Sequence, residues 1–589
     1  MIAAQVSPIH VDQVYAGQEA KLIFSAFSSR TTPELTGHVT KVSADALSDQ
    51  RSGATFYRAE ITLDQGEIEK LEGLTLLPGM PVEAFIKTDD GKIANAATGE
   101  AVGAALVADP RVRGVIFTGS TEVARLIQRS LAARPPGQPE ARLIAETGGQ
   151  NAMIVDASAL AEQVVQDVIA SGFDSAGQRC SALRLLCLQE DIADRVLEML
   201  QLAMGELAVG NPARLATDVG PVIDEAARAG LLAHIEGMRA AGRRVFQYKL
   251  PDDTAAGCFV PPTLIEIGRV EELAGEVFGP VVHVLRYPAA RLERLVDAIN
   301  ATGYGLTFGM HSRIGAQIDA VTRRIRAGNL YVNRNMVGAV VGVQPFGGEG
   351  LSGTGPKAGG PLYLVRLLGL GDVPPEALGL QRRPAGEALP APCAALDALE
   401  AWAEGRGRGA LAQVCRDDRG ASLLGWEAWL PGPTGESNRL HFVPRGAVLC
   451  RAGSEAALLA QLAAALATGN TPLLPAAAPL PPDLPAAVTR HLRQLAPGER
   501  AACVAVLAEG EAEALAAIRR ELAARDGALV PVIGPDPASG RYPLHRLCGE
   551  RVLTVNTAAA GGNAALMTLA VQGVSAGGLP LHGPVIGGG

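Results

Sequence analysis

Aromatic residues are scarce in this chain of 589 residues, at 4% of the sequence, and charged residues make up only 19%. Lysine and arginine form no block and the formal net charge is −9, so nothing in the sequence indicates nucleic-acid binding. The sequence also lacks a run of about 18 apolar residues, which excludes a membrane-spanning helix. The first residues show neither the charged nor the apolar region of a signal peptide. We therefore expect a cytoplasmic protein.

The sequence has eight cysteines but no Cys-x-x-Cys pair and no histidine cluster near them. A metal site is therefore not expected, and scattered cysteines in a large chain indicate a reduced protein. For seven of them we expect the role of a small buried hydrophobic side chain. These seven are Cys187, Cys258, Cys393, Cys415, Cys450, Cys503 and Cys548. The neighbours of Cys180 point to chemistry instead.

Apolar residues make up 48% of the chain, which is enough for several buried cores. Alternating runs at 21–27, 54–63 and 82–88, separated by glycine and proline turns, predict a small all-β segment over residues 1–90. From residue 99 the pattern changes to strands that alternate with helices, which favours a parallel sheet in an α/β fold.

Two later segments show the same α/β pattern of predicted helices and strands. A helix and a buried strand are predicted within 159–188, with Cys180 in the loop between them. A proline- and glycine-rich linker covers 372–393, and residues 394–546 are predicted to form a second, Rossmann-like α/β domain. The remaining residues, 547–589, are expected to hold a C-terminal strand motif and a tail.

Glu146 and Cys180 are the candidate catalytic pair. Glu146 lies where a predicted strand runs into two glycines, a place where α/β folds bind ligands. Cys180 lies in the sequence GQRCSA, in a loop where backbone N–H groups can favour the reactive thiolate. Alone, the acid would be a solvated cap and the cysteine a core residue, but together they suit a nucleophile and a general base.

Eight motifs occur in the order found in aldehyde dehydrogenases. The chain resembles that superfamily, and is most similar to the 1-pyrroline-5-carboxylate dehydrogenase part of bifunctional proline utilisation A. The resemblance implies NAD-dependent oxidation of L-glutamate γ-semialdehyde to L-glutamate. The motifs are FTGSTEVA (117–124), ETGGQN (146–151), GQRCSA (177–182), GNP (210–212), DVGPVI (218–223), EVFGP (276–280), NATGYGLTFG (300–309) and PFGGEGLSGTG (345–355).

The resemblance assigns roles residue by residue. Cys180 would attack the aldehyde and carry a thioester, its backbone N–H would stabilise the oxyanion, and Glu146 would activate the hydrolytic water. The positions that match the NAD site are Thr118, Gly119, Ser120, Val123, Thr147, Gly148, Glu276 and Phe278. The positions that match the anchor for the substrate carboxylate are Arg179, Ser181, Gly350, Ser352 and Gly353. A tight packing turn is the alternative role for this glycine loop.

One part of the family pattern is missing. Residues 99–148 match only a remnant of the NAD-binding domain, whereas 149–371 match the catalytic domain. The family's first βαβ unit, its cofactor-binding lysine and the asparagine that gives the second oxyanion donor have no counterpart before residue 99. Loss of one such donor costs on the order of 10²- to 10³-fold in rate, so we expect an impaired enzyme.

The sequence before the remnant is similar to a different family. Residues 11–50 and 76–88 resemble the C-terminal β-domain of haemolysin-D-type secretion adaptors, and the join falls within Asp89–Thr98. A gene fusion, or an assembly error that joined two truncated frames, explains this best. Residues 394–546 resemble the non-catalytic extra domain of long proline utilisation A proteins, and 550–569 resemble their closing motif. The family dimerises through a β-flap that is partly absent here, so a homodimer is implied but not fixed.

Three interpretations stay open at this point. The chain is a truncated dehydrogenase acting on a small aldehyde that carries a carboxylate, a folded remnant that does not bind NAD, or a fragment of a secretion adaptor. The last has neither a membrane anchor nor coiled-coil heptads with which to act. Binding of NAD separates the first two.

Overall fold

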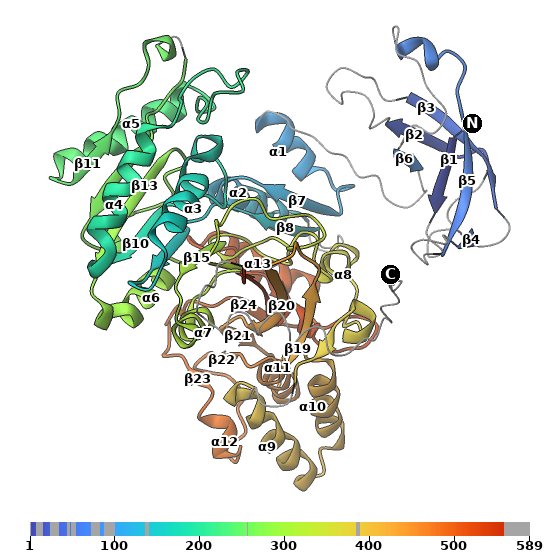
Figure 1. Ribbon diagram of the computed structural model, residues 1–589. Coiled ribbons are helices and arrows are strands. Elements are labelled where there is room, and N and C mark those ends of the chain that lie inside the picture. Colours follow the sequence, from blue (N-terminus) through green and yellow to red (C-terminus); the bar gives the residue numbers. More distant parts are fainter. Residues whose placement is uncertain are drawn as a thin grey trace, which may run out of the picture. The chain divides into compact units, whose positions relative to one another are not determined.

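The computed structural model describes residues 2–6, 16–23, 35–43, 47–48, 55–71, 83–86, 100–135, 141–255, 257–384 and 389–558. The chain divides into two compact units, Met1–Gly103 and Ala104–Gly589. Figure 1 shows the elements of both units coloured along the sequence. Within the described ranges, no helix is both long and apolar enough to cross a membrane.

The first unit is a small antiparallel sheet, as the alternating sequence predicted. Its strand order is β1-β5-β3-β2-β6, with β4 paired to β5. Side chains alternate between the core and solvent along β3, so that Leu35 and Val39 are buried with Leu22 and Ile61. The strands are β1 (Ile2–Val6), β2 (Glu19–Ile23), β3 (Leu35–Val42), β4 (Leu47–Ser48), β5 (Thr55–Leu63) and β6 (Glu83–Ile86). The ends of the predicted runs at 24–27 and 87–88 lie outside the described residues.

The second unit is built around a large sheet of eleven strands. Six central strands are parallel, as the alternation of strands and helices predicted. In order they are β12 (Thr263–Ile267), β13 (Val281–Tyr287), β10 (Leu185–Gln189), β9 (Ala152–Val155), β15 (Thr307–His311) and β16 (Asn329–Val332). The helices that follow these strands in sequence are α3 (Ala161–Phe173), α4 (Glu190–Gly205), α5 (Glu225–Ala240), α6 (Leu292–Ala301) and α7 (Gly315–Arg324).

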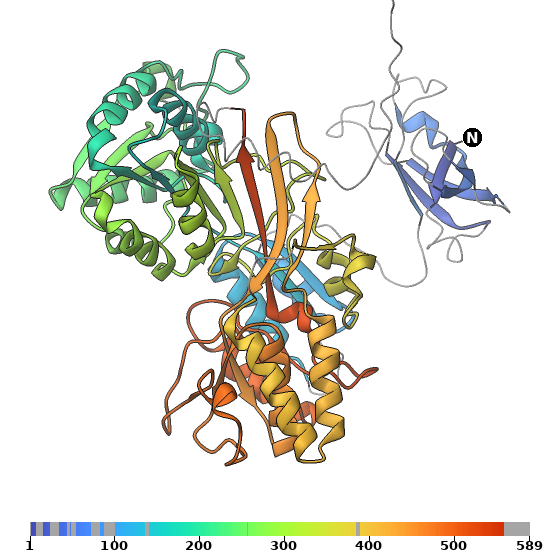
Figure 2. The same cartoon turned by 60° about the horizontal axis from the view of Figure 1, so that its bottom comes forward.

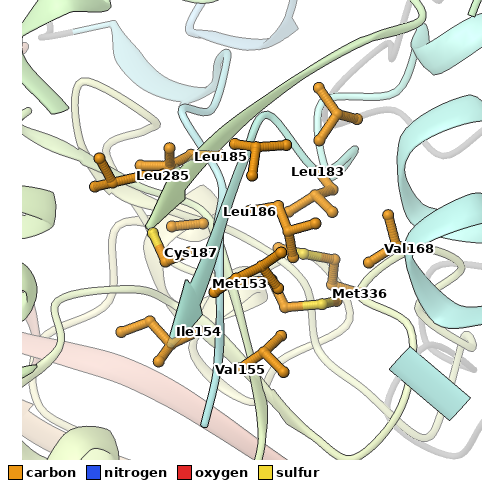
Figure 3. Close-up of a cluster of buried hydrophobic side chains, with 14 of the residues drawn as sticks. Met153, Ile154, Val155, Val168, Leu183, Leu185, Leu186, Cys187, Leu285 and Met336 are labelled. Carbon is orange, nitrogen blue, oxygen red and sulfur yellow. The ribbon is translucent and has the colours of Figure 1, made fainter. Parts of the chain in front are cut away.

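The main core lies along β9 and β10, whose residues are buried on both faces of the sheet. Met153 and Leu186 pack near Met336 in this core, and Cys187 lies beside Leu285 (Figure 3). Continuous apolar strands of this kind are typical of parallel sheets covered by helices. The core therefore fixes the strand ends from which the candidate site is built.

The sheet continues beyond β16 with strands from the C-terminal part of the chain. β26 (Cys548–Asn556) pairs in parallel with β16 and antiparallel with β20 (Glu436–Pro444), and β19 (Trp426–Leu430) and β18 (Gln381–Arg382) follow. β11 (Arg244–Gln247) closes the opposite edge. Residues 550–556 of the predicted closing motif thus belong to an inner strand, whose long path beside β20 is visible in Figure 2, and residues 559–569 of that motif lie outside the described residues. α8 (Leu362–Leu368) lies between this region and the glycine loop in sequence.

A separate two-stranded parallel sheet carries the beginning of the candidate site. β7 (Gly114–Thr118) pairs with β8 (Arg142–Glu146), and α1 (Glu100–Ala108) and α2 (Thr121–Ala132) lie before and between these strands in sequence. Among the described residues β7 has no other strand partner, and Ile116 is 52% exposed. This sheet is the part predicted to be a remnant.

A five-stranded parallel sheet lies within residues 394–546. Its order, β23-β22-β21-β24-β25, matches five of the six strands of a doubly wound nucleotide-binding sheet. Its helix α13 packs on α2, where Arg129 Nε donates to Ala523 O at 3.1 Å. The strands are β21 (Ala447–Arg451), β22 (Thr471–Leu474), β23 (Arg493–Gln494), β24 (Ala505–Ala508) and β25 (Val532–Ile533). The helices are α9 (Ala391–Gly405), α10 (Gly409–Ala421), α11 (Glu455–Ala467), α12 (Ala486–Thr489) and α13 (Ala512–Ala523).

Candidate active site

Glu146 is the last residue of β8, and its carboxylate points into the glycine loop 347–353. Gly348 N donates to Glu146 Oε2 at 3.0 Å, whereas Oε1 is buried without a hydrogen-bond partner. Burial raises the pKa of Glu146 to about 8, although the Gly348 hydrogen bond and the positive charge of Lys357 oppose the rise. A carboxyl with such a pKa can accept a proton near neutral pH.

The glycine loop is tied to the end of β8 by its backbone. Thr147 N donates to Ser352 O at 3.0 Å, and Thr147 Oγ1 donates to Leu351 O at 2.6 Å. Thr354 N donates to Ala145 O at 2.9 Å. Gly347 must be glycine, because a Cβ built on it would stand 2.6 Å from Glu146 Oε1. The loop therefore packs directly on the predicted base.

Cys180 lies in the loop between the 3-10 helix Asp174–Gly177 and β10. Asn151 fixes this loop, since its Nδ2 donates to Cys180 O at 2.7 Å and to Ala182 O at 2.9 Å. Its Oδ1 accepts from Thr307 N at 3.1 Å, which joins the loop to β15. Asn151 follows the glycines after Glu146, so one short segment positions both predicted catalytic residues.

The thiol of Cys180 is partly buried and faces two carboxylates. Burial raises its pKa, and the negative charges of Glu276 and Glu146 raise it further, while backbone N–H donors of Ser181 and Cys180 oppose the rise. The structure thus brings Cys180, Glu146 and Glu276 close enough to interact electrostatically. Because the thiol is protonated at neutral pH, it needs a base to become a nucleophile.

A buried arginine links the cysteine loop to the segment around Glu276. Arg184 NH1 donates to Gly177 O at 2.7 Å and to Gly279 O at 3.1 Å, and NH2 lies 3.4 Å from Glu276 Oε1. The guanidinium also lies 5.2 Å from the Phe278 ring centroid. Glu276 is therefore paired with a buried arginine and is not an isolated carboxylate at the surface.

The residues predicted to bind the cofactor fall into two groups. Thr118, Gly119 and Ser120 are exposed at the N-terminus of α2, where Ser120 Oγ accepts from Val123 N at 3.2 Å. Val123 is itself 42% exposed. A helix N-terminus of this kind attracts anions such as a pyrophosphate, so these residues fit one end of a dinucleotide.

The second group lies nearer to Cys180. Thr147 and Gly148 are buried, and a Cβ built on Gly148 would stand 2.0 Å from Glu276 Oε2, so the carboxylate rests on the glycine backbone. Phe278 is 44% exposed. A surface made of a carboxylate and an open aromatic ring fits the ribose and ring end of the same ligand.

The residues predicted to anchor the substrate are placed differently from one another. Arg179 is exposed, and its Nε donates to Ser175 Oγ at 3.0 Å. Ser181 is buried next to Cys180, and Ser352 is fully buried, with its Oγ accepting from Gly305 N at 3.0 Å. Gly350 and Gly353 adopt left-handed φ values of 65° and 157° that favour glycine.

Three residues of the site were not singled out from the sequence, namely Asn151, Arg184 and Lys357. Asn151 stood within a quoted motif, and its position after two glycines was the one available signal. Arg184 and Lys357 are buried cations bonded to backbone carbonyls. Their sequence neighbours give no sign of that burial, because the partners come from distant segments.

Comparison with known proteins gives matches for both units. Residues 89–368 match the aldehyde dehydrogenase family, and residues 1–89 match the AprE-like β-barrel domain. A bifunctional protein PutA from Salmonella typhimurium is 54% identical over 490 residues, or 80% of this chain and 37% of that protein. A 1-pyrroline-5-carboxylate dehydrogenase from Geobacillus thermodenitrificans is 39% identical over 271 residues, or 46% of this chain and 52% of that protein.

A solved structure of a 1-pyrroline-5-carboxylate dehydrogenase from Thermus with bound NAD is also similar. It is 37% identical and covers 45% of this chain and 51% of that chain, with a TM-score of 0.43. The present chain spans between about a third and about half of the length of the two curated relatives. The two family matches meet at residue 89, at one end of the predicted join.

Proposed function

Residues 89–368 belong to the aldehyde dehydrogenase family, and on that premise we propose that this chain oxidises L-glutamate γ-semialdehyde to L-glutamate through a thioester on Cys180. The observation that carries the proposal is that the charge of Glu146, whose carboxylate is held by the glycine loop, acts on the Cys180 thiol. The chemistry requires a thiol, a base and backbone donors at one point, and these residues supply each of them.

The proposed steps begin with proton transfer. Glu146, whose pKa burial raises to about 8, takes the proton of the Cys180 thiol, and the sulfur bonds to the aldehyde carbon. The backbone N–H of Cys180 donates to the oxyanion that forms. NAD, when bound, supplies the chemistry of accepting a hydride. Loss of that hydride from the substrate carbon leaves a thioester, and Glu146 passes the proton that it took from the thiol to solvent. Glu146 then takes a proton from water as the water oxygen bonds to the thioester carbon, and the C–S bond breaks to release the acid, with that proton returned to the sulfur as the thiol.

The proposed NAD site uses the exposed start of α2 for the pyrophosphate and the surface of Glu276 and Phe278 for the nicotinamide end. Helix N–H groups and the helix dipole favour the negative phosphates. For the substrate carboxylate we propose an anchor made of Ser181 and the backbone of Gly350 and Gly353, because small carboxylates bind well to concave runs of N–H groups. Arg179 adds positive charge at the exposed side.

The proposal is tested by incubating the purified chain with L-glutamate γ-semialdehyde and NAD and following NADH and glutamate together. We expect both products in equal amounts, and none from Cys180→Ser. Cys258→Ser is the matched control, since Cys258 is partly buried and outside the site, and it should keep the wild-type rate. Activity that survives Cys180→Ser would contradict the proposal.

A second candidate is favoured by one observation on β7. Among the described residues this strand pairs only with β8, and Ile116 is 52% exposed. On this candidate the two-stranded sheet is too small to support a dinucleotide. On this candidate the chain keeps a reactive Cys180 but does not bind NAD. Fluorescence titration with NAD, combined with iodoacetamide labelling of Cys180, separates the two: labelling without NAD binding would favour the second.

A further inference from the structure

Lys357 is a buried lysine that follows the glycine loop, and its side chain is 2% exposed. Its Nζ donates to Gly347 O at 2.5 Å and to Asn329 Oδ1 at 2.7 Å. Among the described residues no carboxylate lies within ion-pair distance of this ammonium. A buried charge that is held only by neutral oxygens is costly, which suggests that the charge has a use.

The two oxygens that Lys357 contacts belong to one structural clamp. Asn329 Oδ1 also accepts from Gly347 N at 3.3 Å, and Asn329 Nδ2 donates to Pro345 O at 3.0 Å. Lys357 and Asn329 therefore hold the two ends of the Gly347 residue. The next N–H along the chain, that of Gly348, is the donor to Glu146 Oε2. The lysine thus acts on the predicted base through one peptide unit.

The space around the clamp is closed from a second side. A Cβ built on Gly328 would stand 1.9 Å from Gly347 O and 2.7 Å from Lys357 Nζ. The Gly347 carbonyl consequently has no room to turn away from the ammonium. The direction of the Gly348 N–H is fixed by this packing.

The C-terminal strand β26 adds charge to the same place. Glu550 Oε2 accepts from Lys357 N at 2.8 Å, and its Oε1 is buried without a partner. Lys357 also faces the charges of Glu146, Glu349 and Arg551, and Arg445 acts on Glu550. The positive charge of Lys357 opposes protonation of Glu146, whereas the negative charge of Glu550 favours it.

We propose that Lys357 is a positioning residue, whose ammonium fixes the Gly347–Gly348 peptide against Glu146 and keeps that carboxylate available as a base. This inference rests on the proposed function, since it assigns Lys357 a task in the hydrolysis of the Cys180 thioester. Glu550 is the counterpart that works in the opposite direction. The sequence-distant strand β26 is thereby connected to the site through the Glu550–Lys357 hydrogen bond and through Arg551, which lies 3.6 Å from Glu349 of the glycine loop.

The two variants that test this are Lys357→Met, which removes the positive charge together with the terminal atom of the side chain, and Glu550→Gln, which removes the negative charge and keeps the side-chain length. The assay is hydrolysis of p-nitrophenyl acetate without cofactor, in which a rapid burst reports acylation of Cys180 and the steady rate reports deacylation. Removal of the lysine charge should move the midpoint of the deacylation pH profile upward. The steady rate at pH 7 should then fall by about tenfold for each pH unit by which the midpoint moves. Glu550→Gln should move the midpoint downward.

Lys249→Met is the matched control, because Lys249 is 89% exposed and pairs only with Asp252; it should leave the profile unchanged. A shift in the same direction for both variants, or no shift, overturns the inference, since a merely structural defect would not produce opposite shifts. If Lys357→Met does not fold, Glu550→Gln alone tests the inference: a downward shift of the midpoint supports it, and an upward shift or no shift overturns it. Absence of any burst in the wild type would overturn the proposed function instead, and the inference with it.

Discussion

Side chains of the candidate site act largely by holding backbone carbonyls in place. Asn151 binds those of Cys180 and Ala182, and Arg184 binds those of Gly177 and Gly279. This arrangement makes the position of the thiol depend on residues that do no chemistry themselves. A small displacement of a reacting group lowers the reaction rate strongly.

Asn151→Ala should both destabilise the chain and slow acylation of Cys180. Three backbone groups, including Thr307 N, would lose a buried partner, at a cost of about 1–3 kcal/mol. The misplaced thiol should react about 10- to 10²-fold more slowly in the ester burst. Asn211→Ala, at an exposed loop position, is the control. An unchanged burst in the Asn151 variant would show that the loop holds its shape without the asparagine.

At this scale, glycines and motif order made Glu146 and Cys180 candidates from sequence, and in the structure the charge of Glu146 acts on the Cys180 thiol. Their roles stay predictions. Lys357 and Arg184 could not be predicted, because a lysine or arginine is normally exposed. Only the tertiary contacts with Gly347, Asn329 and Gly279 show that these two charges are buried.

Among the elements, the glycine loop 347–353 has the least room for change. Gly347→Ala should cost about 1–3 kcal/mol of stability, because its Cβ would meet Glu146 Oε1 at 2.6 Å and the Lys357 backbone at 3.2 Å. Deacylation should slow as well, by at least the factor that corresponds to the lost stability, because the added methyl group displaces the Glu146 carboxylate. Gly230→Ala in α5, with nothing within 4 Å, should be neutral or stabilising by up to about 1 kcal/mol. An equal change in stability for Gly347→Ala and Gly230→Ala would refute the predicted clash at Gly347.

β13 provides a pH-dependent contribution to stability through His283. The imidazole is 1% exposed, and Nε2 lies 2.9 Å from His234 Nε2, while Nδ1 lies 3.1 Å from Arg184 O. Burial lowers the pKa of His283 to about 4, from 6.5. Between pH 6.5 and about pH 4, His283 binds a proton in the unfolded chain but not in the folded chain, so the stability of the fold falls as the pH falls.

Urea unfolding between pH 6.5 and pH 4 tests this contribution. Wild type should lose about 3 kcal/mol more than His283→Gln across that window. His491→Gln, outside the parallel sheet, should follow the wild-type curve. A wild-type curve parallel to that of His283→Gln would mean that His283 becomes charged within the fold.

The existence and type of most elements followed from sequence periodicity. The alternation of strands and helices that the sequence predicts from residue 99 is present in β7, α2, β8 and β9. The pairing of β26 between β16 and β20 did not follow, because strand partners far apart in sequence leave no local pattern. For the same reason, the contact of α13 with α2 was unforeseen.

On the scale of the whole molecule, the chain is mixed α/β with a small all-β unit at its start. The two units have separate cores, with Leu22, Leu35 and Ile61 in the first and the β9–β10 layer in the second. Absence of the first part of an NAD-binding domain stays a prediction, as do the domain boundaries.

Deletion of residues 1–90 should therefore leave the larger unit intact. We expect the full chain to show two thermal transitions, of which the deletion removes one, while the other keeps its midpoint and Cys180 keeps its rate of alkylation. The physical reason is that each unit has buried apolar residues of its own. Loss of both transitions on deletion would show that the two units fold as one.

The account depends most on a covalent acyl intermediate at Cys180 that Glu146 resolves. The most direct measurement is peptide mass spectrometry of Glu146→Gln after mixing with L-glutamate γ-semialdehyde and NAD, with wild type alongside. The account predicts an acyl adduct on the tryptic peptide Cys180–Arg184 that forms more slowly in the variant, because the thiol has lost its base, but persists there, whereas wild type hydrolyses it. An adduct on another cysteine, or NADH formation by the variant with no adduct at all, would contradict it.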